Sequence, residues 1–305
     1  MRRLGIALAA LLSLYTDALA ASSPERFASL DDAVTSLISA IRADDRQKVL
    51  RILGPAGRPL IWSGDSVADR QAADKFLADY DKSHRLQGGS GKVVLYVGPD
   101  DFPFAIPLVP DGDSWEWDAA AGRDEILKRR IGRDELSAIQ VCLAYVDAQR
   151  EYYAQDRKGN GILQYAQHLR STPGKRDGLY WPTRDGDKPS PLGTLVAQAR
   201  REGYQRQAAG PVPYHGYFYR ILTAQGPDAP GGAYDYVVNG QMIGGFGLVA
   251  FPAQYGNSGV MTFIVNHDGV VYEKDLGPNT ARIAGEMKVF SPDQTWRKVD
   301  PTAGQ

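Results

Sequence analysis

The stretch V-M-T-F-I-V-N-H-D-G-V-V-Y-E-K-D-L-G, from Val260 to Gly277, decides the fold of the second half of the chain. Two β-rich runs flank the tripeptide His267-Asp268-Gly269. Asp-Gly between two such runs is a strong hairpin signal, because glycine adopts positive φ without steric cost. No serine-based nucleophile motif or matched set of catalytic partners lies nearby in the sequence. We therefore predict a hairpin corner at His267-Asp268 rather than half of a catalytic site.

A long helix is predicted before this sheet, in the segment R-R-I-G-R-D-E-L-S-A-I-Q-V-C-L-A-Y-V that begins at Arg129. Its apolar residues recur at helical spacing over a wide sector that includes Leu136, Ile139, Leu143 and Val146. Cys142, the only cysteine, lies in this sector, so we expect a buried, inert thiol and no intrachain disulfide. Strand-like runs follow, including G-Y-F-Y-R-I-L-T-A and G-F-G-L-V-A-F-P. The second half is thus predicted to be a long core helix packed on an antiparallel sheet.

The first half combines helical patterns with a later β-rich segment. L-D-D-A-V-T-S-L-I-S-A-I-R, from Leu30, has an apolar face and two acidic residues in its first turn. A further helical pattern follows Asp65, which is suited to cap it. The runs K-V-V-L-Y-V-G, F-P-F-A-I-P-L-V and S-W-E-W-D then predict an antiparallel meander. Helices followed by a meander indicate an α+β fold with helices on one face of the sheet, similar to the cone of nuclear-transport-factor-type domains.

The chain begins M-R-R-L-G-I-A-L-A-A-L-L-S-L-Y-T-D-A-L-A-A, with two arginines, an apolar run and small residues before Ala21. This pattern predicts a secretory signal peptide over residues 1–20 rather than a membrane anchor, since the run is shorter than the roughly 20 residues that span a bilayer. The mature chain is expected to be periplasmic or secreted, without a transmembrane segment. We divide it into an α+β cone-like domain, residues 21–132, and a second α+β domain, residues 133–305.

Charge and histidine spacing restrict the classes of partner. The 35 Lys and Arg residues nearly balance the 36 Asp and Glu residues, so nothing in the net charge favours nucleic acid or an anionic membrane surface. The four histidines are widely separated, and none has metal-ligand spacing with another. We predict no nucleic-acid partner and no cofactor.

Aromatic residues mark the candidate pocket or partner surface in each half. A cone can enclose a pocket, and its aromatic side chains either line that pocket or fill the core solidly. At the entrance to a predicted strand, P-Y-H-G-Y-F-Y presents the same two alternatives. The candidate residues are Trp62, Tyr80, Tyr96, Trp115, Trp117, His215, Tyr217 and Tyr219.

One loop, D-R-K-G-N-G-I-L-Q-Y-A-Q, has part of a calcium-binding pattern. Asp156, Asn160 and the carbonyl of Ile162 would take ligand positions one, five and seven. Lys158 and Gln167 stand where anionic ligands are needed. The alternative is a Gly-rich turn, and we predict no metal site.

The succession R-D-E-L-S-A-I-Q-V-C-L-A-Y-V-D-A-Q-R-E-Y, D-G-L-Y-W-P, P-Y-H-G-Y-F-Y-R-I-L-T-A-Q-G-P and G-G-F-G-L-V-A-F-P-A-Q-Y-G-N-S-G resembles a bacterial exported family classed as a domain of unknown function. The resemblance covers nearly the whole mature chain. It implies an envelope location and carries over no catalytic residues.

The second half is also similar to the globular domain of bacterial pilins and pseudopilins. The matching residues are Glu135, Ala138, Ile139, Ala148, Gln149 and Tyr152 in the helix, Gly159-Asn160-Gly161 in the loop, and Phe263, Val265, Asp268, Gly269 and Val270 in the sheet. No transmembrane half-helix precedes Glu135. This resemblance therefore implies a pilin-like head, residues 133–305, that lacks the membrane helix.

Together these observations predict an exported protein with a non-catalytic role in binding or in envelope assembly and maintenance. Its partner would be an envelope protein or a small ligand. The alternative is an envelope hydrolase acting on cell-wall or carbohydrate material, with acid and base groups drawn from the loop carboxylates Asp177, Asp185, Asp187 and Asp235. Two carboxylates at glycosidase separation in a cleft would distinguish the enzyme.

Overall fold

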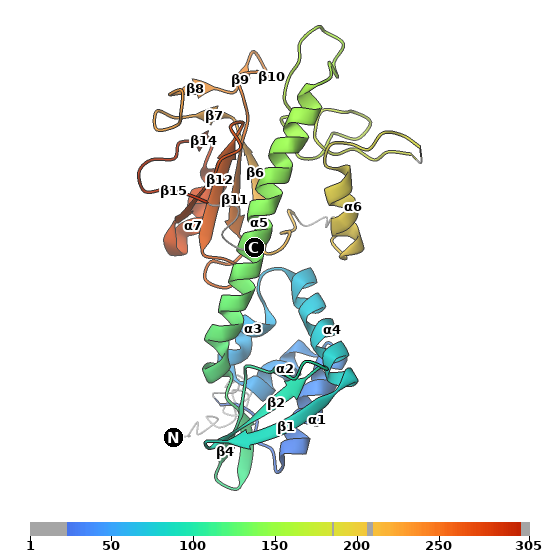
Figure 1. Cartoon of the computed structure of the whole chain (residues 1–305), viewed down its shortest axis with the longest axis vertical. Helices are drawn as coiled ribbons and strands as arrows, with labels where there is room; N and C mark the ends of the chain where they lie inside the picture. The colour runs from blue at the N-terminus through green and yellow to red at the C-terminus, as the bar shows by residue number, and fades with distance from the viewer. Residues whose placement is uncertain (1–22, 185, 206–209, 300–305) are drawn as a thin grey trace, which may run out of the picture. The chain divides into compact units, whose positions relative to one another are not determined.

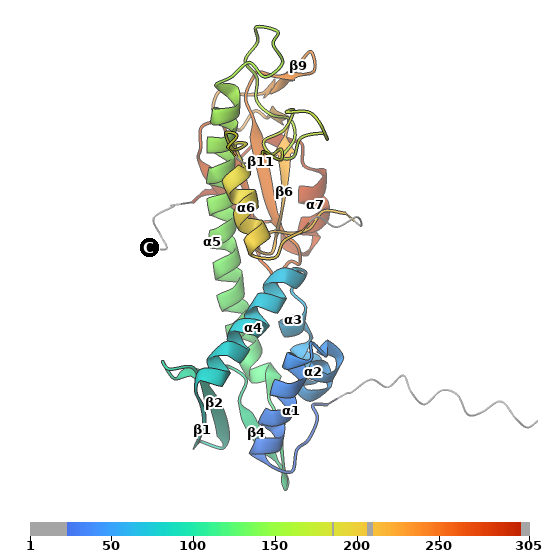
Figure 2. The same cartoon turned by 90° about the vertical axis from the view of Figure 1, so that its right-hand side faces the viewer.

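The computed structural model describes residues 23–184, 186–205 and 210–299 (Figures 1 and 2). The chain is a mixed α+β protein, which confirms the predicted fold class. It forms two compact units: the first comprises the chain up to Ile61 with Phe76–Arg123, and the second comprises Trp62–Lys75 with the chain from Asp124 onward. The predicted signal peptide, residues 1–20, lies outside the described residues.

The first unit begins with short helices. They are α1 (Leu30–Arg42), α2 (Arg46–Leu53), the 3-10 turn η1 (Pro55–Gly57), α3 (Arg58–Ile61) and the later part of α4 (Ser66–Lys82). Helix α1 starts where the sequence predicts, because the Ser29 side chain accepts a hydrogen bond from the Asp32 N–H at 3.1 Å. Its buried face contains Val34, Leu37 and Ile38.

An antiparallel sheet completes the first unit. Its strands are β1 (His84–Gly89), β2 (Lys92–Val97), β3 (Phe102–Pro103), β4 (Leu108–Asp111) and β5 (Ser114–Trp117). The strand order is β1-β2-β4-β5, and β3 pairs with β2. The predicted meander is therefore present, with an additional first strand, β1, made mostly of exposed residues.

The second unit is built on a five-stranded sheet with the order β15-β13-β12-β11-β6, antiparallel throughout. The strands are β6 (Tyr217–Leu222), β11 (Gly247–Pro252), β12 (Met261–Asn266), β13 (Val271–Asp275) and β15 (Arg297–Lys298). Short strands form two smaller sheets: β7 (Ala224–Gln225), β8 (Tyr234–Asp235) and β14 (Val289–Phe290), and the pair β9 (Val237–Val238) and β10 (Gln241–Met242).

Helices cover both faces of the five-stranded sheet (Figure 2). The long helix α5 (Ala119–Tyr153) places Cys142 and Tyr145 in one buried cluster with Leu248 and Phe263 of the sheet. The next residues along the same strands, Val249 and Ile264, point to the other face and pack with α7 (Thr280–Glu286). Helix α6 (Gly193–Arg201) and the 3-10 turn η2 (Gly277–Asn279) complete the unit. A sheet buried on both faces explains why its central strands are almost continuously apolar.

Helix α5 begins at Ala119, earlier than the predicted start near Arg129, because the Asp118 carboxylate accepts the Ala121 N–H at 3.0 Å and caps the helix. The predicted division between residues 132 and 133 falls inside this helix and stays a prediction. Cys142 is fully buried, and burial raises the pKa of its thiol to about 12, as expected of an inert cysteine.

The predicted hairpin is confirmed between β12 and β13, with Val265 opposite Val271. Gly269 has φ of 79° and donates its N–H to the Asn266 carbonyl at 3.0 Å. The Asn266 side chain also accepts the Asp268 N–H at 3.1 Å. The His267 imidazole and the Asp268 carboxylate are 3.8 Å apart, at the corner of this turn. The local hydrogen bonds account for the sequence H-D-G without a catalytic role.

Candidate functional site

A cavity of about 560 Å³ lies in the second unit, between its helices and one face of its sheet. We call it the apolar cavity. Helix α5 contributes Val141 and Tyr145, α6 contributes Leu195, Val196 and Ala199, and the strands β6 and β11 contribute Tyr219 and Leu248. Residues 169–170, 180, 192, 204–205 and 210–214 from the connecting segments complete the lining. The volume is within the range of small-molecule sites.

Hydrogen bonds order the long connection between α5 and α6 that forms one wall of the cavity. Gln149 on α5 is fully buried; its amide donates to the Ala166 carbonyl and accepts the Ala166 N–H, each at 2.8 Å. Farther along, Tyr180 donates its N–H to Leu169 and accepts from Ser171. Gly178 permits this close approach, since a Cβ there would lie 2.6 Å from the Arg170 carbonyl carbon. The connection is therefore fixed although it has little regular secondary structure.

Three of the tyrosine hydroxyls around the cavity, those of Tyr145, Tyr204 and Tyr219, are already paired within the protein. Tyr145 donates to the Gly247 carbonyl at 3.0 Å, and Tyr219 donates to the Tyr214 carbonyl at 3.3 Å. Burial raises the pKa of Tyr145, Tyr214 and Tyr219 well above the usual tyrosine value, so all three stay protonated at neutral pH. The walls thus present mainly hydrocarbon and aromatic surface.

One charged residue, Arg170, lines the apolar cavity. Its guanidinium lies 4.7 Å from the centre of the Tyr180 ring, and the guanidinium of Arg200 lies 5.5 Å from the same ring. Within the described part of the chain, neither arginine is in an ion pair with a carboxylate. Arg170 therefore offers a free positive charge at the edge of an apolar space.

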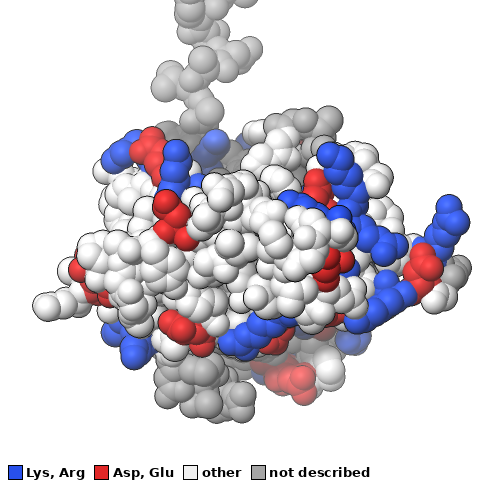
Figure 3. All heavy atoms as spheres, turned by 90° about the horizontal axis from the view of Figure 1, so that it is seen from above, with Lys and Arg blue, Asp and Glu red and all other residues white. Residues whose placement is uncertain are grey.

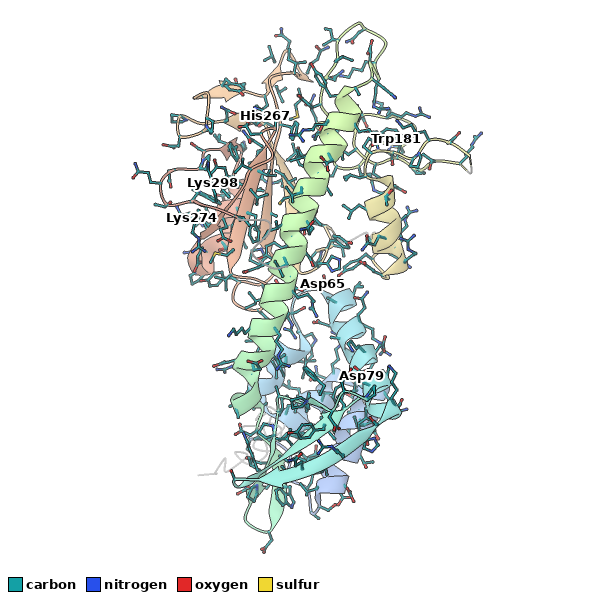
Figure 4. All side chains as sticks on the ribbon, in the orientation of Figure 1. Asp65, Asp79, Trp181, His267, Lys274 and Lys298 are labelled. Carbon is teal, nitrogen blue, oxygen red and sulfur yellow. The ribbon has the colours of Figure 1, made fainter. Side chains whose placement is uncertain are left out.

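A buried polar cluster lies beside this cavity, at the start of α4, where Figure 4 labels Asp65. Asp65 is 1% exposed and caps α4 by accepting the N–H groups of Val67 and Ala68, as its sequence position predicts. Its second oxygen accepts the Tyr204 hydroxyl and the Gly216 N–H, each at 2.9 Å. One carboxylate therefore satisfies four donors and ties three segments of the second unit together.

Asp134 lies in the same environment and has the most informative electrostatics. Burial raises the pKa of its carboxyl to about 6, against the opposing effect of Arg133, whose guanidinium donates to it at 3.0 Å. The negative charge of Asp65 raises this pKa further. No sequence pattern indicates this cluster, because Asp65, Asp134 and Tyr204 are far apart in the chain and belong to no motif.

The sequence-predicted aromatic residues lie in several places, and one of them lines the apolar cavity. That residue is Tyr219. Tyr217, the next residue on its strand face, is fully buried in the core and donates its hydroxyl to the Met261 carbonyl. His215 lies in the turn before β6, with φ of 48°, and its imidazole is 3.3 Å from the Glu202 carboxylate. Burial is the main cause that lowers the pKa of His215.

The remaining five candidates are not brought into one pocket. In the first unit, Trp117 is fully buried, and Tyr80 stacks on His84 with ring centres 3.8 Å apart. The Arg85 guanidinium lies 4.2 Å from the centre of the Tyr96 ring. Trp115 is half-buried and pairs with Phe27 through a β-bridge. In the second unit, the Trp62 carbonyl accepts the Asn257 side-chain amide at 2.7 Å.

The loop with part of a calcium pattern is held by its own backbone. The Asp156 carboxylate accepts the N–H groups of Lys158, Gly159 and Gly161. These hydrogen bonds, above all the one from Gly161, lower the pKa of Asp156. Asn160 accepts the Ile162 N–H at 3.2 Å. These bonds form the Gly-rich turn that was the alternative reading of the sequence. Across residues 23–184, 186–205 and 210–299, no three His, Cys, Asp or Glu side chains gather as a metal would require.

The fold and the site define an α+β protein whose second unit holds an apolar cavity between two helices and an antiparallel sheet. The chain belongs to the family described as "Protein of unknown function (DUF2950)", which matches residues 24–299. No match was found among curated proteins or among solved structures. In the described residues, no helix is both long enough and apolar enough to cross a membrane.

Proposed function

We propose that this protein is an exported, non-catalytic binding module of the bacterial envelope that holds a small amphipathic ligand in the apolar cavity. The observation that carries the proposal is the lining: it consists of aliphatic and aromatic side chains from α5, α6, β6 and β11, and the hydroxyls of Tyr145 and Tyr219 already have protein acceptors. Such walls favour an apolar body. Arg170 at the same cavity favours a ligand with one anionic end.

Export and a pilin-like head are the second part of the proposal. The N-terminal sequence supports a periplasmic or secreted location, and the packing of α5 on an antiparallel sheet is the arrangement that a pilin-like head would have. The envelope hydrolase stays the alternative prediction. Of its loop carboxylates, Asp177 and Asp187 accept N–H groups of their own loops, from Thr172 and Arg184, while Asp185 lies outside the described residues.

A pair of fluorescent probes tests the cavity. We expect the anionic dye 1-anilinonaphthalene-8-sulfonate and the neutral dye N-phenyl-1-naphthylamine to bind the native protein with saturation. Ala199→Trp places an indole in the cavity and should abolish binding of both dyes. The matched control is Ala197→Trp, on the same helix but exposed and outside the lining, which should bind as the wild type does. Thermal unfolding of each variant excludes dye binding to a partly unfolded state.

The charged end of the ligand has its own test. Arg170→Ala should weaken binding of the sulfonate dye by about tenfold and leave binding of the neutral dye unchanged, because only the sulfonate dye has a charge to pair with the guanidinium. Equal dye binding by the wild type and a folded Ala199→Trp variant would exclude the cavity as the binding site. Loss of both dyes in Arg170→Ala would show that this residue shapes the cavity rather than recognises charge.

Export predicts a defined mature end. Mass spectrometry of the protein recovered from the envelope or medium should find Ala21 as the first residue. A mature chain that still contains Arg2 and Arg3 would contradict the proposed cleavage.

A further inference from the structure

A second cavity, of about 440 Å³, lies at the C-terminal end of α5, within the second unit. Four cationic side chains line it: Arg157, Lys158, Lys175 and Arg176. We call it the cationic cavity. In Figure 3, Lys and Arg side chains gather toward the right of the picture. Helix α6 and the connection before it lie on the same side in Figure 1.

The protein compensates the positive charge of this cavity only in part, because one carboxylate, Asp177, lies among the four cationic side chains of the lining. Over the described ranges, none of the four cationic side chains forms an ion pair. The one carboxylate in the lining, Asp177, already accepts the N–H and the hydroxyl of Thr172, at 2.7 and 2.8 Å. Four cationic side chains against one carboxylate leave an excess of like charge whose members repel one another, so a bound anion would stabilise the arrangement.

Aromatic rings hold two of the guanidinium groups in place. Arg157 lies 4.8 Å from the centre of the Tyr152 ring and 5.0 Å from that of Trp181, and Arg176 lies 5.5 Å from Trp181. Trp181, labelled in Figure 4, belongs to the connection before α6. Stacking of this kind restricts the rotamers of an arginine while its N–H groups stay able to donate. These two guanidinium groups are thus positioned before any ligand arrives.

A buried, unpaired amide gives independent evidence that the cavity suits a polar ligand. Gln164 lines the cationic cavity and is only 3% exposed, yet its Nε2 has no hydrogen-bond partner among the described residues. A buried side-chain donor without an acceptor is uncommon, because leaving it unpaired costs free energy. Gln164 therefore offers an unpaired donor in the lining of the cationic cavity.

We propose that the cationic cavity binds the phosphoryl group of a phosphate or pyrophosphate compound. Two arginine forks and two lysines match an anion that has several oxygens and more than one negative charge, whereas a single carboxylate would neutralise only one of them. The nearby rings of Tyr152 and Trp181 can contact the organic part of such a compound. This site is separate from the apolar cavity, and the two proposals stand independently.

The experiment is calorimetric titration of the full mature chain with inorganic pyrophosphate at low ionic strength. We expect saturable binding, weakened about tenfold or more in the double variant Lys158→Glu with Lys175→Glu. The matched control is Lys92→Glu with Lys288→Glu, which changes the net charge equally at exposed lysines outside the cavity. Gln164→Leu should also weaken binding while raising the melting temperature of the free protein, since it removes the unpaired amide.

Two arms separate a soluble phosphoryl compound from a lipid headgroup. Sedimentation with phosphatidylcholine vesicles that contain phosphatidylglycerol tests the lipid. If the protein binds pyrophosphate and only the cavity variant loses this binding, the ligand is a soluble compound. If the protein binds the vesicles but not pyrophosphate, and only the cavity variant loses vesicle binding, the ligand is a lipid headgroup. Binding of neither probe overturns the proposal. So does equal weakening in the two double variants, which would show an effect of net charge only.

Discussion

Replacing Asp65 by alanine should destabilise the second unit far more than the loss of an ordinary helix cap. The carboxylate caps α4 through the N–H groups of Val67 and Ala68, and it also accepts the Tyr204 hydroxyl and the Gly216 N–H. Asp65 is 1% exposed, so water does not replace these bonds readily. Asp65→Ala therefore removes the cap and leaves two further buried donors unpaired.

The expected loss follows from these two effects. Removing a cap costs about 1 kcal/mol. Each buried donor left without an acceptor costs roughly 1–3 kcal/mol. A small gain offsets part of the loss, because the negative charge of Asp65 no longer acts on Asp134. We expect the free energy of unfolding to fall by about 3–6 kcal/mol.

Equilibrium unfolding in urea, followed by circular dichroism and tryptophan fluorescence, measures this loss. Asp45→Ala is the matched control, because Asp45 caps α2 through the Lys48 N–H, is exposed and should cost only about 1 kcal/mol. In a double-mutant cycle, Asp65→Ala and Tyr204→Phe should couple by about 1–2 kcal/mol. Equal losses for Asp65→Ala and Asp45→Ala, or additive effects in the cycle, would refute the reasoning.

Two further predictions concern Asp134 and the hairpin. Burial raises the pKa of Asp134 from 3.8 to about 6, so the unfolded chain loses this proton at a lower pH than the folded chain does. The free energy of unfolding therefore falls as the pH rises between these two values, by about 3 kcal/mol for this group. Asp134→Asn should therefore gain stability relative to the wild type from pH 4 to pH 7 in urea unfolding, and a constant difference would contradict the raised pKa. Gly269→Val should lower stability by about 1–3 kcal/mol, because the φ of 79° at this position strains a β-branched residue. Crowding is not the cause, since the atom nearest to an added Cβ is 3.5 Å away. His267→Ala should cost less than about 1 kcal/mol, and thermal unfolding in which the two variants are equal would reject the turn assignment.

The sequence predicted those features that depend on neighbouring residues. The Asp-Gly corner, the amphipathic α1 and the buried Cys142 each follow from a short pattern, and all three are confirmed. Strand β1 was missed because its residues, from His84, are mostly exposed and carry no alternation of apolar and polar side chains.

The start of α5 was missed for a tertiary reason. The sequence predicts the end of the meander after Trp117, and Gly122 does not favour a helix there. In the structure a Cβ at Gly122 would collide with the backbone of Ala105, so glycine is needed where the helix passes close to this chain segment. The apolar cavity could not be predicted either, because its walls come from elements separated by long connections and share no sequence period.

The pairing of Gln149 with Ala166 has a consequence for exchange kinetics. The side-chain amide imitates a peptide group, since it both donates to and accepts from the same backbone residue while fully buried. Slow exchange of backbone amides with deuterium is typical of the core helices and sheets of a protein. The N–H of Ala166 belongs to neither, yet it can exchange only when α5 releases the connection. Its protection factor would report the opening of this wall separately from the unfolding of the sheet.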